Sequence, residues 1–391
     1  MRIRRVRATP VNLPFSAPYR FAYGSTASLT KTIVEVETDE GLVGLGEGAD
    51  GDTARLIQTL GERLAGLDPL DLNECERRCV PAMSHAPWDN LSALRRAFGA
   101  IEIALWDLRA RTEGLPLHRL LGGAVRTRIP LTEYFAFRLP GATEPGEAGP
   151  VDIARYCARM IELHDAAGFE GKIGVESLSE EARMLREVRA AIGEERLLRV
   201  DANGAFTVAT ALEYWRRIER YDIRTFEDPV DTLAEMRRLR PHMACTFSTH
   251  NPDLRTAVEL GVPDAFVCNL VELGGIRRTV EFIRACELFG IAFWFHSQEA
   301  GIATAAALHV SAALEPIREP SQTLLRWLTD DVTHEGPLVP HGGHVDVPGG
   351  PGLGVTLDPR ALKRCHQRYL DEGAFPTGGA STHYGADFRR R

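Results

Sequence analysis

No stretch of this 391-residue sequence is apolar for long enough to cross a membrane. A spanning helix needs about 18 or more consecutive apolar residues, whereas the most apolar run, residues 289–295, ends at His296 after seven. The amino end, residues 1–9, is basic but lacks the apolar stretch of a secretion signal. These absences predict a protein without membrane partners.

Paired cysteines and an excess of positive charge are also missing. The seven cysteines are scattered, with no C-x-x-C pair, which is typical of reduced thiols in a cytoplasm. The net charge is −8, from 46 basic and 54 acidic residues, which argues against a partner with a phosphate backbone. The hydrophobic fraction of 44% is ordinary for a folded protein. We therefore expect a cytoplasmic globular protein that binds no nucleic acid, with a length that fits two or three domains.

A glycine-rich G-x-G-x-x-G turn is absent as well, and this absence decides between two fold classes. From about residue 129, short apolar segments alternate with helical patterns and end near Lys172, Asp201, Glu227, Thr246, Asn269 and His296, at separations of 19 to 29 residues. This spacing predicts repeated strand–helix units. A doubly wound dinucleotide-binding sheet would carry the glycine-rich turn, so the sequence favours a (β/α) barrel.

The remaining segments differ from this repeat. Residues 1–126 begin with alternating β-branched residues and continue with helical patterns, which predicts an α+β domain. Residues 127–334 hold the barrel pattern. Residues 335–391 are rich in glycine and proline at their start, and we expect them to return to the first domain instead of forming a third.

Charged residues follow several of the predicted barrel strands. Asp201 and Glu227 end two successive apolar segments, and strand ends of a barrel converge on one active-site mouth. A single carboxylate there is more often a helix cap or a solvated loop acid, but two in register suit a hard cation such as Mg²⁺. Lys172 precedes them by one repeat, and His296 lies about half a barrel away. Two such groups on opposite sides of a metal-bound acid suit removal of the proton next to its carboxylate.

The order Lys-x-Gly, Asp-x-Asn, Glu-Asp-Pro, His-Ser, behind a segment ending Leu-Leu-Gly-Gly, resembles the enolase superfamily. Within it, the mandelate racemase branch and its glucarate-dehydratase-like members are the most similar. The resemblance implies an α/β fold: a modified (β/α)₇β TIM-type barrel with an N-terminal α+β capping domain. It further implies Mg²⁺, a small-molecule acid substrate held between the two domains, and a homo-oligomer.

The resemblance also implies roles for individual residues. Asp201 and Glu227 would bind the metal, Lys172 would be the base and His296 the acid/base on the opposite face. Asn203 would bind substrate or a metal-bound water, and Ser297 would contact substrate. Arg20 and Tyr23 lie in the loop that closes over the substrate, where Arg20 suits a distal carboxylate or is an ordinary surface arginine.

Three positions depart from the family pattern. Glu170 replaces the first lysine of a Lys-x-Lys motif and would add negative charge or a different substrate contact. The third metal ligand falls on Thr246, a weak neutral ligand, so that His250 or a water could serve instead. The aspartate that would orient His296 is Asn269, which could hold the ring through its carbonyl oxygen but could not stabilise its charged form.

These departures favour unequal roles for the lysine and the histidine. Lys172 as base and His296 as acid fit dehydration of an acid sugar, an aldarate or aldonate, to a 2-keto-3-deoxy acid. Racemisation or epimerisation of a 2-hydroxy or amino acid derivative ranks second, because both groups would then work in both directions. The three altered positions keep open a degenerate, non-catalytic barrel.

Overall fold

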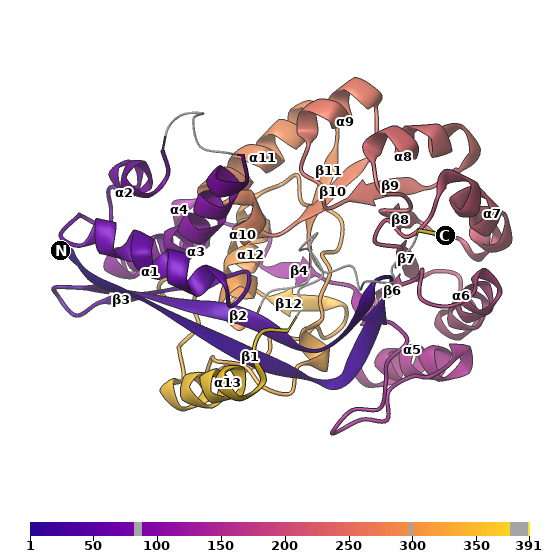
Figure 1. Ribbon diagram of the computed structural model, residues 1–391, viewed down its shortest axis with the longest axis horizontal. Helices are drawn as coiled ribbons and strands as arrows, with labels where there is room; N and C mark the ends of the chain where they lie inside the picture. Colours follow the sequence, from indigo (N-terminus) through magenta and orange to yellow (C-terminus); the bar gives the residue numbers. More distant parts are fainter. Residues whose placement is uncertain (82–87, 297–299, 376–389) are drawn as a thin grey trace.

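The computed structural model describes residues 1–81, 88–296, 300–375 and 390–391. An antiparallel sheet with its own helices lies beside a larger curled parallel sheet with helices on its outside (Figure 1). No helix in these described ranges has both the length and the apolar character needed to cross a membrane. All seven cysteines are free and buried.

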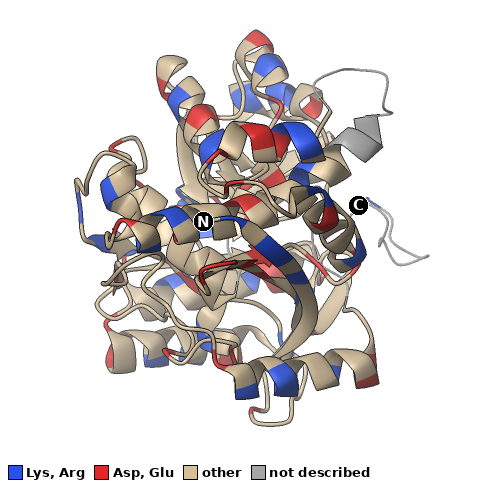
Figure 2. Ribbon diagram, turned by 90° about the vertical axis from the view of Figure 1, so that its left-hand side faces the viewer, with Lys and Arg blue, Asp and Glu red and all other residues tan. Residues whose placement is uncertain are grey.

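The N-terminal part consists of a three-stranded sheet covered by helices. Its strands are β1 (Ile3–Phe21), β2 (Gly24–Thr38) and β3 (Val43–Gly48), and its helices are α1 (Thr53–Leu64), α2 (Leu72–Cys79), α3 (Trp88–Thr112) and α4 (Leu117–Leu120). Alternation along β2 sends Val34 and Val36 into the core shared with α1 and α3, and Ile33 into the core shared with the curled sheet. The N-terminal sheet is thus buried on both faces. Acidic and basic residues are interspersed over this side of the molecule (Figure 2).

Two glycines allow α3 to lie directly on β3. A Cβ atom at Gly44 would lie 2.1 Å from the carbonyl oxygen of Ala104, and one at Gly46 would lie 2.1 Å from that of Ala100. Such distances are far inside van der Waals contact, so a side chain at either position would push the helix away. The Gly-x-Gly pattern in this strand therefore serves packing.

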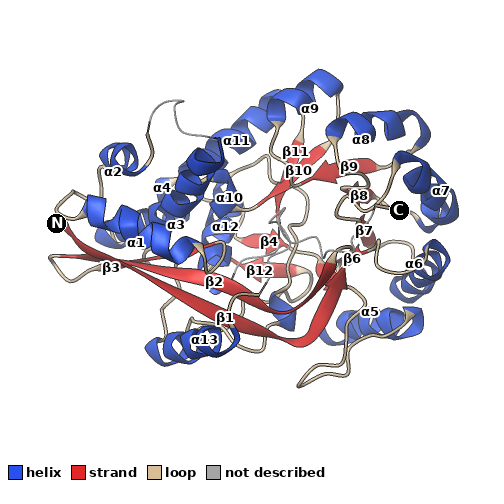
Figure 3. Ribbon diagram, in the orientation of Figure 1, coloured by secondary structure: helices blue, strands red, loops and turns tan. Residues whose placement is uncertain are grey.

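The curled sheet has seven parallel strands in the order β11-β10-β9-β8-β7-β6-β5, with helices along its outside (Figure 3). The strands are β5 (Glu133–Phe135), β6 (Gly168–Lys172), β7 (Leu197–Asp201), β8 (Thr225–Glu227), β9 (Thr246–Thr249), β10 (Ala265–Cys268) and β11 (Ala292–Phe295). The helices are α5 (Pro150–His164), α6 (Leu178–Ile192), α7 (Val208–Ile218), α8 (Leu233–Leu239), α9 (Leu254–Leu260), α10 (Leu270–Leu273), α11 (Ile276–Leu288) and α12 (Gly301–Ala313). The α/β prediction and the N-terminal antiparallel sheet are confirmed.

The two edges of this half-barrel are joined by an irregular segment. Ser321 forms a parallel bridge with Leu131, just before β5, and the backbone N–H of Gln322 donates to the carbonyl of Phe295 at the end of β11 (3.0 Å). Two residues thus satisfy backbone groups that would otherwise be exposed at the sheet edges.

The segment after residue 334 adds a strand to a separate two-stranded sheet and packs a helix on the N-terminal sheet. Strand β12 (His344–Asp346) pairs antiparallel with β4 (Arg128–Pro130), and helix α13 (Pro359–Glu372) packs against β1. The side chain of Asn12 in β1 donates to the carbonyl of Gly373, just beyond α13 (2.9 Å). Helix α13 and the residue after it therefore lie against the first strand, whereas Arg391 contacts Ala205 of the half-barrel through its backbone N–H (2.9 Å).

Two carboxylates of the N-terminal part bind helix N-termini of the half-barrel. Glu47 in β3 accepts a hydrogen bond from the backbone N–H of Ala300, at the start of α12 (2.7 Å). Glu102 in α3 accepts one from that of Ile276, at the start of α11 (2.7 Å). A negative charge at the positive end of a helix is stabilising, so both contacts fix the capping sheet on these helices.

A buried histidine pair also links the two parts. His309 in α12 is fully buried, with Nδ1 3.1 Å from Nδ1 of His118 and Nε2 3.1 Å from the carbonyl oxygen of Leu353. Burial lowers the pKa of His309 to about 4, and the charge of His118 acts in the same direction. The folded state therefore holds His309 neutral.

We expect this histidine to make folding pH-dependent. The folded pKa lies below the ordinary value of 6.5, so the unfolded chain binds the proton more readily, and stability falls as the pH drops from about 6.5 to about 4. The difference between the two pKa values corresponds to a change of roughly 3 kcal/mol in the free energy of unfolding. Chemical denaturation at pH 7 and pH 4 measures how much folding stability is lost between the two pH values. This loss should be smaller for His309→Gln than for the wild type. An equal loss in both would contradict this, and the exposed His334 provides the control variant His334→Gln.

Candidate active site

Three of the predicted residues stand at the ends of neighbouring strands. The parallel pairing puts Lys172 of β6 opposite Asp201 of β7, and Asp201 opposite Glu227 of β8. All three side chains are buried, and the Lys172 ammonium group forms an ion pair with the Asp201 carboxylate. The structure therefore brings the base and the two carboxylates to one level at the carboxyl edge of the sheet.

The charge of Asp201 controls the protonation of Lys172. Burial alone would lower the pKa of Lys172, but the negative charge of Asp201, together with Tyr134, Tyr19 and Glu227, holds this pKa well above its usual value. The Tyr134 ring lies under the ammonium group, 5.8 Å from its centroid. Lys172 can accept a proton only when the charge of Asp201 is engaged by another cation.

Glu227 lies in a crowded group of carboxylates. Burial raises its pKa well above the usual range, and the charges of Asp201 and Glu170 add to this rise. Its Oε1 atom is buried without a hydrogen-bond partner in the described part of the chain. Buried carboxylates with a free oxygen form an environment that a hard divalent cation stabilises.

His250 and Asp228 complete a set of donors around Glu227. His250 Nδ1 lies 3.7 Å from Glu227 Oε1 and 2.6 Å from Asp228 Oδ2, and one ligand atom from each of the three residues lies within 4.8 Å of the others. The charge of Asp228 raises the pKa of His250 well above its usual value. Asp228 was not predicted: its φ of 35° breaks the strand alternation that would have turned its side chain away from Glu227.

The structure does not bring Thr246 to this group. Thr246 begins β9 and pairs with Thr225, whereas the residue opposite Glu227 is Ser248. Thr246 therefore lies two residues, or about 6.6 Å along a strand, from the level of Glu227. The sequence pattern predicted Thr246 at the end of this strand, but Thr246 is its first residue. His250, which follows β9, lies where the third metal ligand was expected.

Asn203 orients Asp201. In the turn after β7 its φ is 47°, which is tolerated better by Asn than by most residues. Its backbone N–H donates to Asp201 Oδ1 (2.8 Å), and its Nδ2 donates to Asp201 Oδ2 (3.0 Å). The side-chain carbonyl oxygen of Asn203 is buried without a partner in the described structure, so it is available to a ligand.

Glu170 belongs to the floor of the site. It lies two residues before Lys172 in β6, on the same face of the strand. It is fully buried and accepts a hydrogen bond from Nε2 of Gln322 (2.8 Å). The same Gln322 nitrogen donates to Glu227 Oε2 (2.6 Å), and Arg199 Nη1 lies 3.7 Å from Glu170 Oε2. Glu170 thus adds negative charge that Arg199 partly balances. Gln322 was not predicted, because it lies in the irregular closing segment and carries no periodic signal.

His296 follows β11, at the far edge of the sheet from Lys172. Its pKa is lowered well below the usual value by burial and by the charges of Lys172, His250 and Lys31. Asn269 does not hold its ring as expected: Asn269 Oδ1 accepts the backbone N–H of Glu272 as the cap of α10 (2.9 Å). His296 Nδ1 is buried without a hydrogen-bond partner in the described ranges.

The segment predicted as a closing loop is the end of β1 and the hairpin turn after it, and it contributes less free charge than predicted. Arg20 Nη1 lies 2.5 Å from Glu176 Oε1, in the loop after β6, and its side chain is 34% exposed. The Tyr23 ring packs against Phe21, with centroids 4.7 Å apart. Tyr19 and Phe21, at the end of β1, are buried, and the phenol group of Tyr19 acts on the pKa of Lys172. The predicted contact residue Ser297 lies outside the described residues.

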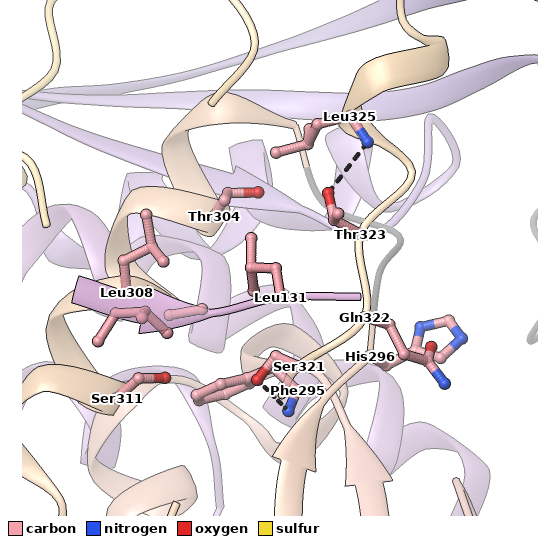
Figure 4. A pocket seen from close by; sticks show the side chains of 12 residues that line it. Leu131, Phe295, His296, Thr304, Leu308, Ser311, Ser321, Gln322, Thr323 and Leu325 are labelled. Carbon is pink, nitrogen blue, oxygen red and sulfur yellow. Dashed lines mark hydrogen bonds between the residues drawn. The ribbon is translucent and has the colours of Figure 1, made fainter. Parts of the chain in front are cut away.

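A cavity adjoins the site behind His296 and Gln322 (Figure 4). It encloses about 380 Å³ of empty space, part of it open to solvent, and apolar side chains such as Leu131 and Leu308 line most of it. Its polar groups, apart from His296 and Gln322, are hydroxyls of serine and threonine. The charged cluster and this apolar cavity are therefore separate surfaces that meet at His296 and Gln322.

Comparisons with known proteins match nearly the whole chain. The family profile described as Enolase C-terminal domain-like matches residues 152–361, and that described as Mandelate racemase / muconate lactonizing enzyme, N-terminal domain, matches residues 3–122. A chloromuconate cycloisomerase from Pseudomonas putida is 30% identical over 93% of this chain and 98% of its own. An N-succinyl-L-Arg/Lys racemase from Bacillus cereus is 26% identical over 93% and 97%. A probable glucarate dehydratase from Streptomyces coelicolor is 28% identical over 88% and 86%.

Solved structures agree in fold. An enolase from Pseudomonas fluorescens, with bound magnesium, potassium and tartrate, superposes with a TM-score of 0.87 at 29% identity, over 95% of this chain and 93% of its own. The similar proteins thus share their architecture and differ in the reactions for which they are named.

Proposed function

The chain belongs to the mandelate racemase and muconate lactonizing enzyme group of the enolase superfamily, and from this premise we propose that it is a Mg²⁺-dependent acid-sugar dehydratase. In the proposed reaction, a base removes the proton next to a carboxylate and a hydroxyl group leaves the neighbouring carbon as water, giving a 2-keto-3-deoxy acid. The closing segment at residues 321–322 supports the finer fold assignment, a modified (β/α)₇β barrel.

The donors of this site fit a magnesium ion. Asp201 and Glu227 offer carboxylate oxygens, and the free Oε1 of Glu227 is the observation that carries this assignment. We propose His250 as the third ligand in place of Thr246. Bound there, Mg²⁺ would hold the substrate carboxylate and stabilise the negative charge that develops when the adjacent proton leaves.

The different surroundings of Lys172 and His296 are the observation that favours dehydration over racemisation. Lys172 is paired with a carboxylate, whereas His296 has no carboxylate partner among the described residues and has a depressed pKa. A low pKa makes the protonated ring a strong acid, which suits proton delivery to a leaving hydroxyl. Burial and the nearby positive charges lower the pKa of His296, and an anionic substrate would offset the contribution of those charges.

A racemase or epimerase is the second candidate. The observation that favours it is the separation of Lys172 and His296, which stand on β6 and after β11 with four strands between them in the curled sheet. This arrangement suits proton transfer on two faces of one carbon.

One screen tests the reaction. Mono- and di-acid sugars are incubated with the protein and Mg²⁺ in D₂O and followed by NMR. Dehydration predicts a 2-keto-3-deoxy product, whereas racemisation or epimerisation predicts deuterium in recovered substrate without that product. Absence of both across the screen would favour a non-catalytic barrel.

Magnesium is expected to stabilise the protein. At about 100 times its Kd, a ligand that binds only the folded state adds about 2.7 kcal/mol, which for a chain of this length raises Tm by about 3 °C. Glu227→Gln should lose this shift, whereas Glu315→Gln, at an exposed position, should keep it. A wild-type Tm that does not respond to Mg²⁺ would contradict the metal assignment.

The same measurement separates the two candidates for the third ligand. His250→Ala should weaken the response to Mg²⁺, because it removes a donor next to Glu227. Thr246→Val should leave the response to Mg²⁺ intact. A weaker response in Thr246→Val together with an unchanged response in His250→Ala would instead make Thr246 the third ligand.

A further inference from the structure

Lysine is rare in this chain, and its three positions are distinctive. Of 46 basic residues only Lys31, Lys172 and Lys363 are lysines. Lys363 is exposed on α13, and Lys172 belongs to the site described above. Lys31, in β2, is only 3% exposed. It nevertheless has no hydrogen bond or ion pair with any other residue in the described part of the chain.

A nearly buried ammonium group without a hydrogen bond or ion pair is unusual, because buried lysines are normally paired. Lys31 is 3% exposed, and its nitrogen keeps a small accessible surface. A group that arrives from outside the chain can therefore reach the ammonium and supply a partner.

The strand geometry aims Lys31 at the half-barrel. Residues alternate along β2, and the neighbours of Lys31 at positions 29 and 33, Leu29 and Ile33, both belong to the core shared with the curled sheet. Thr30 faces the other way, where its hydroxyl contacts Asn12 and the backbone N–H of Phe375. Lys31 thus lies on the face of the capping sheet that covers the half-barrel.

On that face Lys31 lies on the His296 side of the site. Ile33 pairs with Glu47 of β3, so that Lys31 and Glu47 are diagonal neighbours on one face. The carboxylate of Glu47 is already committed to the backbone N–H groups of Ala300 and Ala303 (2.7 and 3.0 Å), at the start of the helix that follows His296. The positive charge of Lys31 acts on the pKa of both Glu47 and His296.

The cation predicted for a distal carboxylate is less available. Arg20 is paired with Glu176 and one-third exposed, so a substrate would have to displace an ion pair to reach it. Lys31 has no such competitor among the described residues, and its burial strengthens any charge-assisted hydrogen bond that it makes.

We propose that Lys31 binds a second carboxylate of the substrate, on the His296 side of the site, and so selects dicarboxylic over monocarboxylic acids. This inference rests on the proposed function only in sharing its site: the first carboxylate is held by the group around Asp201 and Glu227. Lys31 is a binding residue and takes no part in the proton transfers.

Two small acids test this directly by calorimetry at saturating Mg²⁺. Tartrate and glycerate share a 2,3-dihydroxy acid end and differ by the second carboxylate. We expect the wild type to bind tartrate about 10- to 100-fold more tightly, the range of one charge-assisted hydrogen bond. Lys31→Met should remove this preference and leave glycerate binding within about twofold.

Matched variants keep the test decisive. Lys31→Arg should retain the preference for tartrate, Lys31→Gln should lose it, and Lys363→Met should behave as the wild type. Without ligand, Lys31→Met should melt close to the wild-type temperature, because Lys31 makes no hydrogen bond or ion pair with the described residues that the substitution would break. If Lys31→Met does not fold, the comparison of Lys31→Gln with Lys31→Arg decides.

Three results would overturn the proposal: no preference for tartrate in the wild type, an unchanged preference in Lys31→Met, or an equal loss of affinity for both acids in Lys31→Met. The test needs no turnover. A tartrate preference that depends on Lys31, together with no keto product in the screen, would therefore retain the binding assignment and reject dehydration.

Discussion

Lys172→Ala is expected to lower kcat on the substrate found by the screen by about 10²- to 10⁴-fold, the range that a positioned general base contributes. The same loss should appear in the exchange of the substrate proton with D₂O, because Lys172 is the group proposed to remove it. Lys172→Arg should not restore either rate, since a guanidinium group does not give up its proton in proteins.

The same variant should keep its response to magnesium. Lys172 forms an ion pair with Asp201, so its removal frees that carboxylate and should leave Mg²⁺ binding as tight as in the wild type, or tighter. Lys363→Ala is the matched control, because it removes an exposed lysine far along the chain. Normal turnover in Lys172→Ala, or loss of both turnover and the Mg²⁺ response, would reject the role of base.

His296→Asn is expected to separate two steps that the wild type couples. If His296 delivers the proton to the leaving hydroxyl, formation of the keto product should fall by about 10²- to 10⁴-fold. Exchange of the substrate proton with D₂O should continue, because Lys172 is intact.

This uncoupling is measured by NMR as deuterium in recovered substrate without keto product. Equal loss of exchange and product would instead make His296 the base. His242→Asn, at an exposed position, should change neither rate. A racemase would differ again, with exchange surviving for one stereoisomer of the substrate only.

The strand ends were predictable from the sequence, because they depend on local patterns. Apolar segments at regular spacing located Lys172, Asp201 and Glu227, and parallel pairing of such segments brings their ends to one level. The α/β fold and the N-terminal antiparallel sheet followed from the same patterns.

The errors arose where a contact depends on backbone details or on distant segments. Thr246 was assigned to a strand end because spacing does not define which end of a short apolar segment a residue occupies. Asp228 was missed because a positive φ turns it toward His250. The side-chain oxygen of Asn269 could accept a hydrogen bond from a histidine. Only the structure shows that this oxygen instead accepts the backbone N–H that caps α10.

Gln322 and Lys31 were missed for a further reason. Gln322 reaches Glu227 from 95 residues away, and Lys31 comes from a strand of the capping sheet. Neither position has a periodic pattern or a neighbouring motif that connects it with the charged residues. Only the folded structure connects Gln322 with Glu170 and Glu227 and places Lys31 on the face of the capping sheet that covers the half-barrel.

The two carboxylates that join the parts of this protein also bear on how such a molecule can be recombined. Glu47 and Glu102 hold the capping sheet on the first turns of two half-barrel helices. A chimera that joined this half-barrel to another capping sheet would keep Lys172, Asp201 and Glu227. Without carboxylates at these two points, it would lose the alignment between Lys31 and His296. We therefore expect such a chimera to keep the proposed proton-transfer residue Lys172 and to lose the proposed preference for a second carboxylate.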